Sequence, residues 1–238
     1  MKNKFIIIIP ARIGSKRFPA KNHKKIAGKN LLTLKLEKCL SLNQGDIVVS
    51  SDDEKILSEA KRKGVKYLRR RPTNVSGDIS STEVVYDAVK YYEKTTASKI
   101  DFFVLSQLTT HFIRKKDFNE AISFFCKNKK FNSLIACKEI NFKPFHWCFF
   151  KRNKNMYQAL TQNLSNQIED FINNKKAFIP NGGIYLIRRK KLRKNGKLYS
   201  NPVKVWEMDK QLSIDIDYEE DLVLARHYLK KINNNIEL

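Results

Sequence analysis

The first half of the chain alternates between short, continuously apolar runs and longer segments whose apolar residues recur at helical spacing. A continuously apolar run is typical of a strand that is buried on both faces, as in a parallel sheet covered by helices. The predicted strands are Phe5–Pro10, Asp46–Ser50, Val65–Leu68 and Phe102–Leu105, and the predicted helices include Leu31–Leu42, Val84–Tyr92 and Lys116–Cys126. This alternation predicts an α/β fold, with a mostly parallel, twisted sheet and helices on both faces.

Polar residues and a glycine mark the ends of two predicted helices. Ser51, with Glu54 three residues later, fits a capping box, and Gly64 is placed to end the helix that they begin. Ser80 and Glu83 repeat the capping-box pattern ahead of the next helix.

The second half of the chain is less regular. Its predicted strands are Leu134–Cys137, Gly183–Ile187 and Leu212–Ile216, and a final helix is expected from Tyr218 to about Ile232, with Asp217 and Glu220 as an acidic cap. Residues 140–178 are polar, rich in asparagine and without a clear period. We expect this stretch to form an irregular flap or dimerisation arm within a single domain that spans residues 1–238.

The net charge of the chain is +23, from 47 lysines and arginines against 24 acidic residues. Such a charge fits either a surface for nucleic acid or membranes, or a solvated, lysine-rich surface. The basic residues are spread over the whole length, whereas a polyanion surface is usually concentrated and interleaved with aromatic residues. We therefore favour the solvated surface and expect neither a nucleic-acid nor a membrane partner.

Two further features bear on the compartment. No apolar run approaches the roughly 20 residues that span a bilayer, and Phe5–Ile9 is too short for a secretion signal. We therefore expect a cytoplasmic protein. The cysteines form no CxxC pair, which gives no indication of a zinc or redox site, and we expect them to be buried free thiols. They are Cys39, Cys126, Cys137 and Cys148.

A basic loop follows the first predicted strand, in the segment PARIGSKRFPAKN at residues 10–22. Open α/β sheets bind ligands at the carboxyl ends of their strands. Gly14 lets the backbone approach a ligand closely, and successive N–H groups in such a turn can bind phosphate oxygens. Arg12 offers a bidentate fork for phosphate, whereas Lys16 and Lys21 act as mobile charges. A triphosphate would balance the charge of this loop.

The loop has neither the GxxxxGK[ST] spacing of a P-loop nor the GxGxxG fingerprint of a dinucleotide site. A solvated basic loop is therefore the alternative on composition alone. Its position directly after a buried strand favours the phosphate site.

A pair of carboxylates lies near the end of the chain, where Asp215 and Asp217 alternate with Ile214 and Ile216. In a strand, the isoleucines would pack inward and the two carboxylates would project together. Adjacent carboxylates repel unless a cation lies between them, and Mg²⁺ prefers a few carboxylates combined with substrate phosphates. The alternative is that Asp217 only caps the last helix and Asp215 lies on the surface. The phosphate-like loop in the same chain favours the Mg²⁺ site.

Several segments together resemble the acylneuraminate cytidylyltransferase family, which comprises the CMP-sialic acid synthetases and relatives for legionaminic, pseudaminic and other nine-carbon acidic sugars. PARIGSKRFPAKN is similar to the N-terminal signature of that family, and SIDIDYEEDL is similar to its C-terminal metal-binding segment. Between them lie IVVSSDDEKI, Arg71-Pro72 followed by Asp78, and PNGGIY at residues 180–185, in the order of the family. The resemblance covers essentially the whole chain and implies a Rossmann-like nucleotidyltransferase fold.

The resemblance also implies a reaction, in which the anomeric hydroxyl of an acidic nonulosonic sugar attacks the α-phosphate of CTP and pyrophosphate leaves. The implied cofactor is Mg²⁺, and members of the family are commonly homodimers. The implied roles are stabilisation of triphosphate charge by Arg12 and Lys21, binding of the β- and γ-phosphates by Gly14, Ser15 and Lys16, placement of cytidine by Asn22, Arg71 and Ser81, Mg²⁺ binding by Asp215 and Asp217, and sugar binding by Gln107, Lys143, His146 and Asn181.

Three departures from the family pattern fall in the sugar-facing part. The QPTSP motif of the family is QLTTH at residues 107–111, so Gln107 is kept, both prolines are lost and the loop is expected to be shaped differently. His111 either fills the place of a proline, which we favour, or acts as a catalytic base. Glu169–Asn174 lacks the arginine and proline of an RQxLP-like stretch. Lys143 and His146 lie where relatives place a lysine near the sugar, or their aromatic neighbours pack at a dimer interface.

The acceptor sugar is therefore the open question, and two alternative functions stand beside the favoured one. The first is a Kdo cytidylyltransferase or another sugar nucleotidyltransferase on the same scaffold, although Kdo-activating enzymes usually lack the Lys21-Asn22 ending. The second is a basic nucleic-acid-binding protein that relies on its positive charge.

Overall fold

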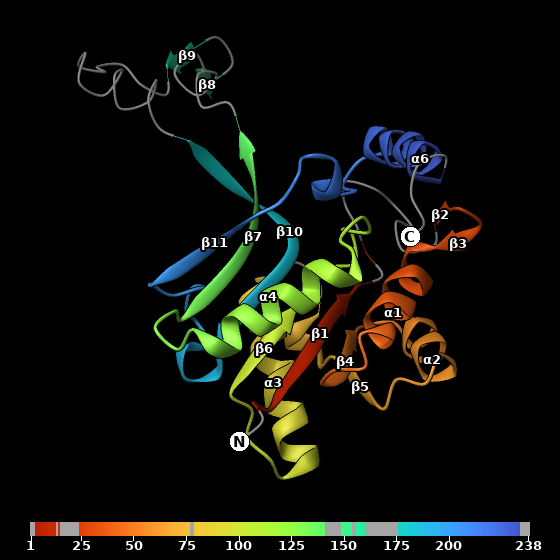
Figure 1. The fold of residues 1–238 in the computed structure, drawn as a ribbon, viewed down its shortest axis with the longest axis vertical. Coiled ribbons are helices and arrows are strands. Elements are labelled where there is room, and N and C mark those ends of the chain that lie inside the picture. The colour runs from red at the N-terminus through yellow and green to blue at the C-terminus, as the bar shows by residue number, and fades with distance from the viewer. Residues whose placement is uncertain are drawn as a thin grey trace.

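The computed structural model describes residues 3–12, 14, 24–76, 79–140, 149–153, 156–159 and 176–233. Within this part of the chain, seven strands form one twisted sheet in the order β11-β7-β10-β6-β1-β4-β5 (Figure 1). Neighbouring strands are parallel except where β10 pairs with β6 and β7. The strands are β1 (Phe5–Ala11), β4 (Asp46–Ser51), β5 (Tyr67–Arg70), β6 (Phe102–Leu105), β7 (Ser133–Ile140), β10 (Ala177–Arg188) and β11 (Val203–Glu207).

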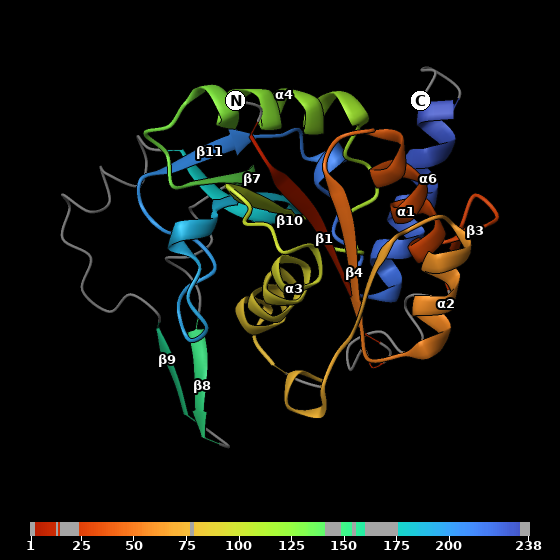
Figure 2. The same cartoon turned by 90° about the horizontal axis from the view of Figure 1, so that it is seen from below.

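Helices cover both faces of this sheet (Figure 2). In β1, Ile7 and Ile9 pack in the core with α1 (Leu31–Ser41), α2 (Glu54–Arg62) and α4 (Lys115–Lys127). Ile6 and Ile8 point to the opposite face and pack with α3 (Ser81–Thr96). Successive strand residues point to opposite faces, so a strand that is covered on both sides must be apolar throughout. The predicted fold class is confirmed.

The predicted helix ends are partly confirmed. Ser80 is the N-cap of α3, and its Oγ accepts a hydrogen bond from the Glu83 N–H at 3.3 Å. Gly64 follows the end of α2 with φ +92°, as a terminating glycine does. Ser51 as the N-cap of α2 was wrong. It is the last residue of β4, and Asp53 caps the helix by accepting from the Lys55 N–H at 2.9 Å.

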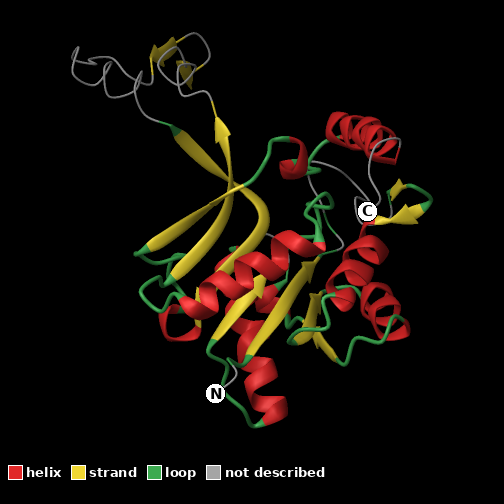
Figure 3. Ribbon diagram, in the orientation of Figure 1, coloured by secondary structure: helices red, strands yellow, loops and turns green. Residues whose placement is uncertain are grey.

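The stretch at residues 140–178 contains regular structure that its sequence did not predict. A two-stranded antiparallel sheet forms from β8 (Phe149–Asn153) and β9 (Met156–Ala159). Below it, β7 and β10 pair from Ser133–Ile187 out to Ile140–Ala177, as a ribbon that extends away from the helices (Figure 3). The composition hid these strands because two short strands that, among the described residues, pair with each other alone need no apolar period. No helix of the described residues is long and apolar enough to cross a membrane.

The predicted strand at Leu212–Ile216 was wrong. Gln211–Ser213 forms a 3₁₀ turn, and the residues after it are not in a strand. The Ile216 N–H bonds instead to the Thr109 carbonyl at 3.1 Å, in the loop after β6. Ile214 and Ile216 are nevertheless buried, as predicted, against α6 (Glu219–Asn233) and the small hairpin of β2 (Lys25–Ile26) and β3 (Lys29–Asn30).

The acidic start of α6 is partly as predicted, since Glu220 lies in the first turn with Glu219 and Asp221, whereas Asp217 precedes the helix by two residues. Asp221 accepts the backbone N–H groups of Asp217 and Tyr218, at 2.9 and 2.8 Å. The turn before α6 is therefore held by a carboxylate from inside the helix.

Candidate active site

Three of the predicted site residues lie just beyond the carboxyl ends of parallel strands. Arg12 follows β1, Arg71 follows β5, and Gln107 lies two residues beyond the end of β6. Strands β1, β4, β5 and β6 are mutually parallel, so these carboxyl ends lie at one edge of the sheet (Figure 1). β1 lies between β4 and β6, which is the kind of position where open α/β sheets bind ligands.

Arg71 is anchored deep in this edge. It is 6% exposed, and its guanidinium donates from Nε to Ser50 Oγ at 3.0 Å and from Nη2 to the Ser50 carbonyl at 2.8 Å. Burial lowers the pKa of Arg71; the charge of Asp52 opposes this, and the charge of Arg12 adds to it. Two arginines thus lie close enough to repel one another. An anion bound between them would relieve that repulsion.

Several predicted residues of the nucleotide and sugar sites lie outside the described part of the chain. Gly14, in contrast, is described and exposed, and a Cβ built on it would meet no atom of the described residues within 4 Å. The predicted residues outside the description are Ser15, Lys16, Lys21, Asn22, Lys143 and His146, together with Asp78 and Glu169–Asn174.

A sharp bend in β10 forms the other wall of the candidate site. The pairing of β10 with β7 shifts register between Pro180 and Tyr185. Within this bend, Gly182 has φ +77°, and a Cβ on it would lie 3.1 Å from Asp215 Oδ2 and 3.2 Å from Gln107 Oε1. Three segments that are far apart in the sequence therefore meet at one glycine.

The charge of the Asp215 carboxylate affects the pKa of a nearby buried tyrosine. Tyr185, on the same strand as the bend, is 8% exposed. Burial raises the pKa of Tyr185 to about 12, and the charge of Asp215 adds to this effect. Nearby, Thr109 Oγ1 is buried and makes no hydrogen bond within the described residues.

Asn181 lies inside the protein, behind the bend. It is 2% exposed, its Oδ1 accepts from the Gly183 N–H at 3.0 Å, and its Nδ2 donates to Ser213 Oγ at 2.9 Å. These bonds tie the bend in β10 to the segment that leads to Asp215. The side chain thus shapes the site in this structure, and its direct contact with a sugar stays a prediction. Ser81 is exposed at the first position of α3.

Lys35 is the residue at this site that sequence reasoning missed. It is completely buried in α1, and its ammonium donates to Ser106 Oγ at 3.2 Å and to the carbonyl and Oγ1 of Thr110. Burial lowers the pKa of Lys35 to about 7; the positive charge of Lys38 adds to this effect, and the charge of Asp215 opposes it. The sequence does hold a signal, because Lys35 lies three residues after Leu32 and four before Cys39, on the apolar face of its helix.

The carboxylates of Asp215 and Asp217 suit Mg²⁺ better than a metal ion that takes all of its ligands from the protein. Asp215 and Asp217 are both half-buried, and they flank the buried Ile216. Among the described residues, no group of three or more His, Cys, Asp or Glu side chains could hold a metal ion. Mg²⁺ commonly binds through one or two carboxylates and completes its shell with water and substrate phosphates. The pair is therefore compatible with a substrate-dependent Mg²⁺ site.

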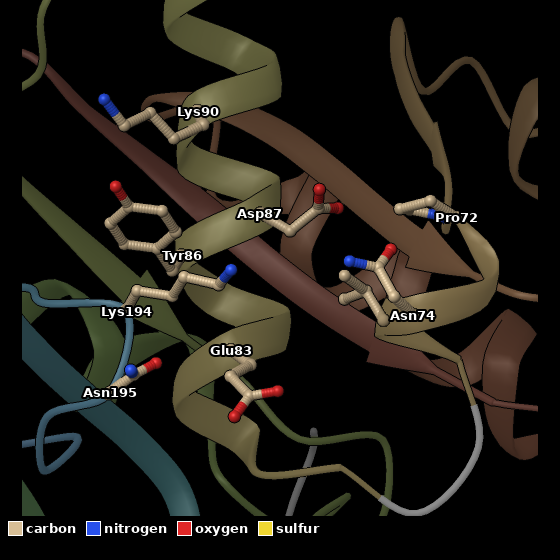
Figure 4. Close-up of a pocket in the computed structure, with 9 residues that line it drawn as sticks. Pro72, Asn74, Glu83, Tyr86, Asp87, Lys90, Lys194 and Asn195 are labelled. Atoms are coloured by element: carbon tan, nitrogen blue, oxygen red, sulfur yellow. The ribbon is translucent and has the colours of Figure 1, made fainter.

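A separate hollow lies beside α3, and Figure 4 shows the side chains around it. Glu83, Asp87 and Lys90 line it from the helix, together with Lys194 from a distant loop. Asp87 is already engaged there by Arg69, with two hydrogen bonds of 2.8 and 2.7 Å. None of the predicted site residues lines this hollow.

The mostly parallel sheet, the arginines at its carboxyl edge and the carboxylate at the bend of β10 fit the class of nucleotidyltransferases. The chain belongs to the cytidylyltransferase family, since the family model described as "Cytidylyltransferase" matches residues 6–143. The resemblance inferred from the sequence motifs is thereby confirmed.

Two relatives are similar over nearly their whole length. A pseudaminic acid cytidylyltransferase of Campylobacter jejuni is 30% identical over 238 residues, which cover 98% of each chain. A CMP-N,N'-diacetyllegionaminic acid synthase of Legionella pneumophila is 27% identical over 231 residues, covering 95% of this chain and 97% of its own. A solved structure of CMP:2-keto-3-deoxy-manno-octonic acid synthetase complexed with CTP matches with a TM-score of 0.66 at 17% identity, over 96% of this chain and 99% of that one. At that identity it supports the fold alone.

Proposed function

We propose that this cytidylyltransferase transfers CMP from CTP to the anomeric hydroxyl of a nonulosonic, sialic-acid-like sugar and releases pyrophosphate. One observation carries the proposal. Asp215 and Gln107 meet at Gly182, at the same sheet edge that holds Arg12 and Arg71. A polar site for a second substrate thus adjoins a cationic site for phosphate. The full-length similarity to cytidylyltransferases named for pseudaminic and legionaminic acid supports the sugar class.

On the nucleotide side, the residues act by positioning and charge. Arg12 and Lys21 stabilise charge on the triphosphate, and Gly14, Ser15 and Lys16 hold the β- and γ-phosphates. Asn22, Arg71 and Ser81 place the cytidine. No covalent intermediate with the protein is required, because oriented reactants and fixed charges lower the barrier to phosphoryl transfer.

On the acceptor side, Gln107 orients the sugar, together with Lys143 and His146, and Asn181 supports the bend that faces it. Asp215 and Asp217 would hold Mg²⁺, which when bound neutralises charge on the phosphate that is transferred. We also propose that the enzyme acts in the cytoplasm as a homodimer. The projecting β7–β10 ribbon and the β8–β9 sheet are suited to reach a second copy (Figure 1).

Pyrophosphate release tests the proposed function. The protein is incubated with CTP and Mg²⁺ and with a panel of pseudaminic, legionaminic and neuraminic acids, and Kdo is included as a separate acceptor. Release with at least one nonulosonic acid is expected. Release with Kdo alone would replace the proposed sugar class with the alternative one. No release with any sugar, together with tight and salt-sensitive binding of RNA, would favour the nucleic-acid-binding alternative.

Asp215→Asn tests the metal assignment. The amide has nearly the shape of the carboxylate but lacks its charge, so Mg²⁺-dependent turnover should be abolished while the circular dichroism spectrum stays unchanged. Asp209→Asn is the matched control, because Asp209 is an exposed aspartate six residues earlier in the chain. Turnover by Asp215→Asn with an unchanged Mg²⁺ dependence would show that the metal is held elsewhere.

A further inference from the structure

Two lysines of α1 reach the loop that carries Gln107. Lys35 donates to Ser106 and Thr110 from complete burial, and Lys38 donates to the His111 carbonyl at 2.5 Å. An ammonium has three N–H donors, and three acceptor atoms surround that of Lys35. Lysines of α1 thus hydrogen-bond the loop after β6 at its start, at Ser106, and at its end, at Thr110 and His111.

This loop supports both polar groups of the acceptor side. Thr110 Oγ1 donates to the Gln107 carbonyl at 3.2 Å, so the residue that Lys35 holds also fixes the backbone of Gln107. The Thr109 carbonyl accepts the Ile216 N–H, which holds the backbone directly after Asp215. Thr110 Cγ2 also lies 3.2 Å from the position of a Cβ on Gly182. Displacement of the loop would therefore move Gln107 and Asp215 with it.

Stability alone does not explain an ionisable amino group at position 35. A buried ammonium loses its hydration, and an apolar side chain of similar volume often stabilises a protein at least as well. Lys35 lies among the apolar residues Leu32, Leu36 and Cys39, which occupy the same helix face. The hydrogen bonds of Lys35 fix the position of the loop backbone, which apolar packing alone would not do. The loop itself has Leu108 and His111 rather than prolines, so it has no ring that restricts φ.

We propose that Lys35 is a positioning residue, which fixes Gln107 and Asp215 relative to each other through the loop at residues 106–111. It does not touch substrate, because no part of its side chain is exposed. The inference rests on the proposed function in one respect, since it assigns Gln107 and Asp215 to the acceptor side of that reaction.

Lys35→Met is the test, since methionine keeps most of the volume and removes every donor. Lys116→Met is the matched control, because Lys116 is an exposed lysine of α4 whose ion pair with Glu120 spans 3.7 Å. Hydrogen–deuterium exchange should show faster exchange in residues 106–111 and at Ile216 in Lys35→Met alone. In the pyrophosphate assay, kcat/KM for the sugar should fall on the order of 10- to 100-fold and the Mg²⁺ requirement should rise, while KM for CTP changes by less than about 2-fold.

The two readouts separate this inference from the proposed function. If the wild type releases no pyrophosphate with any sugar, the proposed function fails, and exchange at Ile216 still decides the role of Lys35. If Lys35→Met keeps wild-type exchange at Ile216 and wild-type dependence on sugar and Mg²⁺, Lys35 only packs and the inference is wrong. If that variant does not fold, Ser106→Ala removes one acceptor and must show the same pattern to a smaller degree. Wild-type behaviour of Ser106→Ala would then overturn the inference.

Discussion

At the scale of single residues, Gly182 combines two constraints. Its φ of +77° is strained for any residue with a side chain, and the space that a Cβ would fill is bordered by Asp215 Oδ2, Gln107 Oε1 and Thr110 Cγ2. Gly183 is more tightly enclosed, since a Cβ there would lie 1.7 Å from Ile113 Cδ1. The two glycines let β10 bend close to the loop after β6. The closeness of Asp215 to Gln107 depends on that bend.

Gly182→Ala should therefore impair activity more than stability. Backbone strain costs about 1 kcal/mol, and the added methyl group also displaces the Asp215 carboxylate or the Gln107 amide. Gly64→Ala is the control, because Gly64 has φ +92° and open space around its Cβ position. Both variants should lose a similar amount in thermal unfolding, and only Gly182→Ala should lose pyrophosphate release. Equal activity of the two variants would show that crowding at Gly182 does not matter.

At the scale of elements, the N-terminus of α3 separates a structural serine from a candidate binding serine. Ser80 caps the helix, and Ser81 is the exposed residue that follows it. The free N–H groups of a helix N-terminus favour polar and anionic partners, so a hydroxyl at this end is well placed for a nucleotide. Neighbouring serines of the same element thus have different expected roles.

Replacing each serine with alanine should separate the two roles. Ser80→Ala should lower the free energy of unfolding by about 1 kcal/mol, which is a loss of roughly 2–4 °C in Tm, with KM for CTP unchanged. Ser81→Ala should leave Tm unchanged and raise KM for CTP. Thermal unfolding and initial rates at varied CTP measure both quantities. If Ser81→Ala binds CTP as the wild type does, Ser81 has no part in placing cytidine.

At the scale of the whole molecule, a buried ion pair joins α3 to the far end of β10. Arg189 donates two hydrogen bonds of 2.9 Å to the Glu93 carboxylate, and the Glu93 side chain is 3% exposed. Lys99 forms an ion pair with the same carboxylate, with 3.5 Å between Lys99 Nζ and Glu93 Oε2. Burial alone would raise the pKa of Glu93, but the bonds and charges of Arg189 and Lys99 outweigh it, and the pKa is lowered. A carboxylate with a lowered pKa stabilises the fold at pH values above its unfolded pKa.

Glu93→Gln should therefore reveal an acid-sensitive contribution to stability. Near neutral pH the variant should be less stable by about 3 kcal/mol, because Arg189 keeps its charge and loses its partner. The difference from the wild type should shrink as pH falls below 4.5, the ordinary pKa of the carboxyl group, and vanish once Glu93 is protonated in the native protein. Thermal unfolding at pH 7 to 3 measures this. Glu54→Gln is the control, since Glu54 is 75% exposed, and a constant difference for Glu93→Gln would contradict the prediction.

The sequence by itself determined the parts of this protein that depend on local burial. Phe5–Ala11 had to be apolar throughout to lie between two layers of helices, so its pattern predicted both the strand and the parallel sheet around it. The same strand placed Arg12 at a ligand-binding edge. Isoleucines 214 and 216 were predicted to be buried for the same reason, even though the strand assigned to them was wrong.

Only the tertiary structure decided how distant segments meet. No periodicity in Ala177–Arg188 shows that it lies antiparallel beside β6, or that Gly182 brings Gln107 within reach of Asp215. The burial of Lys35 and the internal bonds of Asn181 were equally hidden, because a polar side chain carries no local sign of the partners that satisfy it inside the protein. Hydrophobic periodicity reports which face of a segment is buried, whereas the chemistry of this site depends on which segments share that interior.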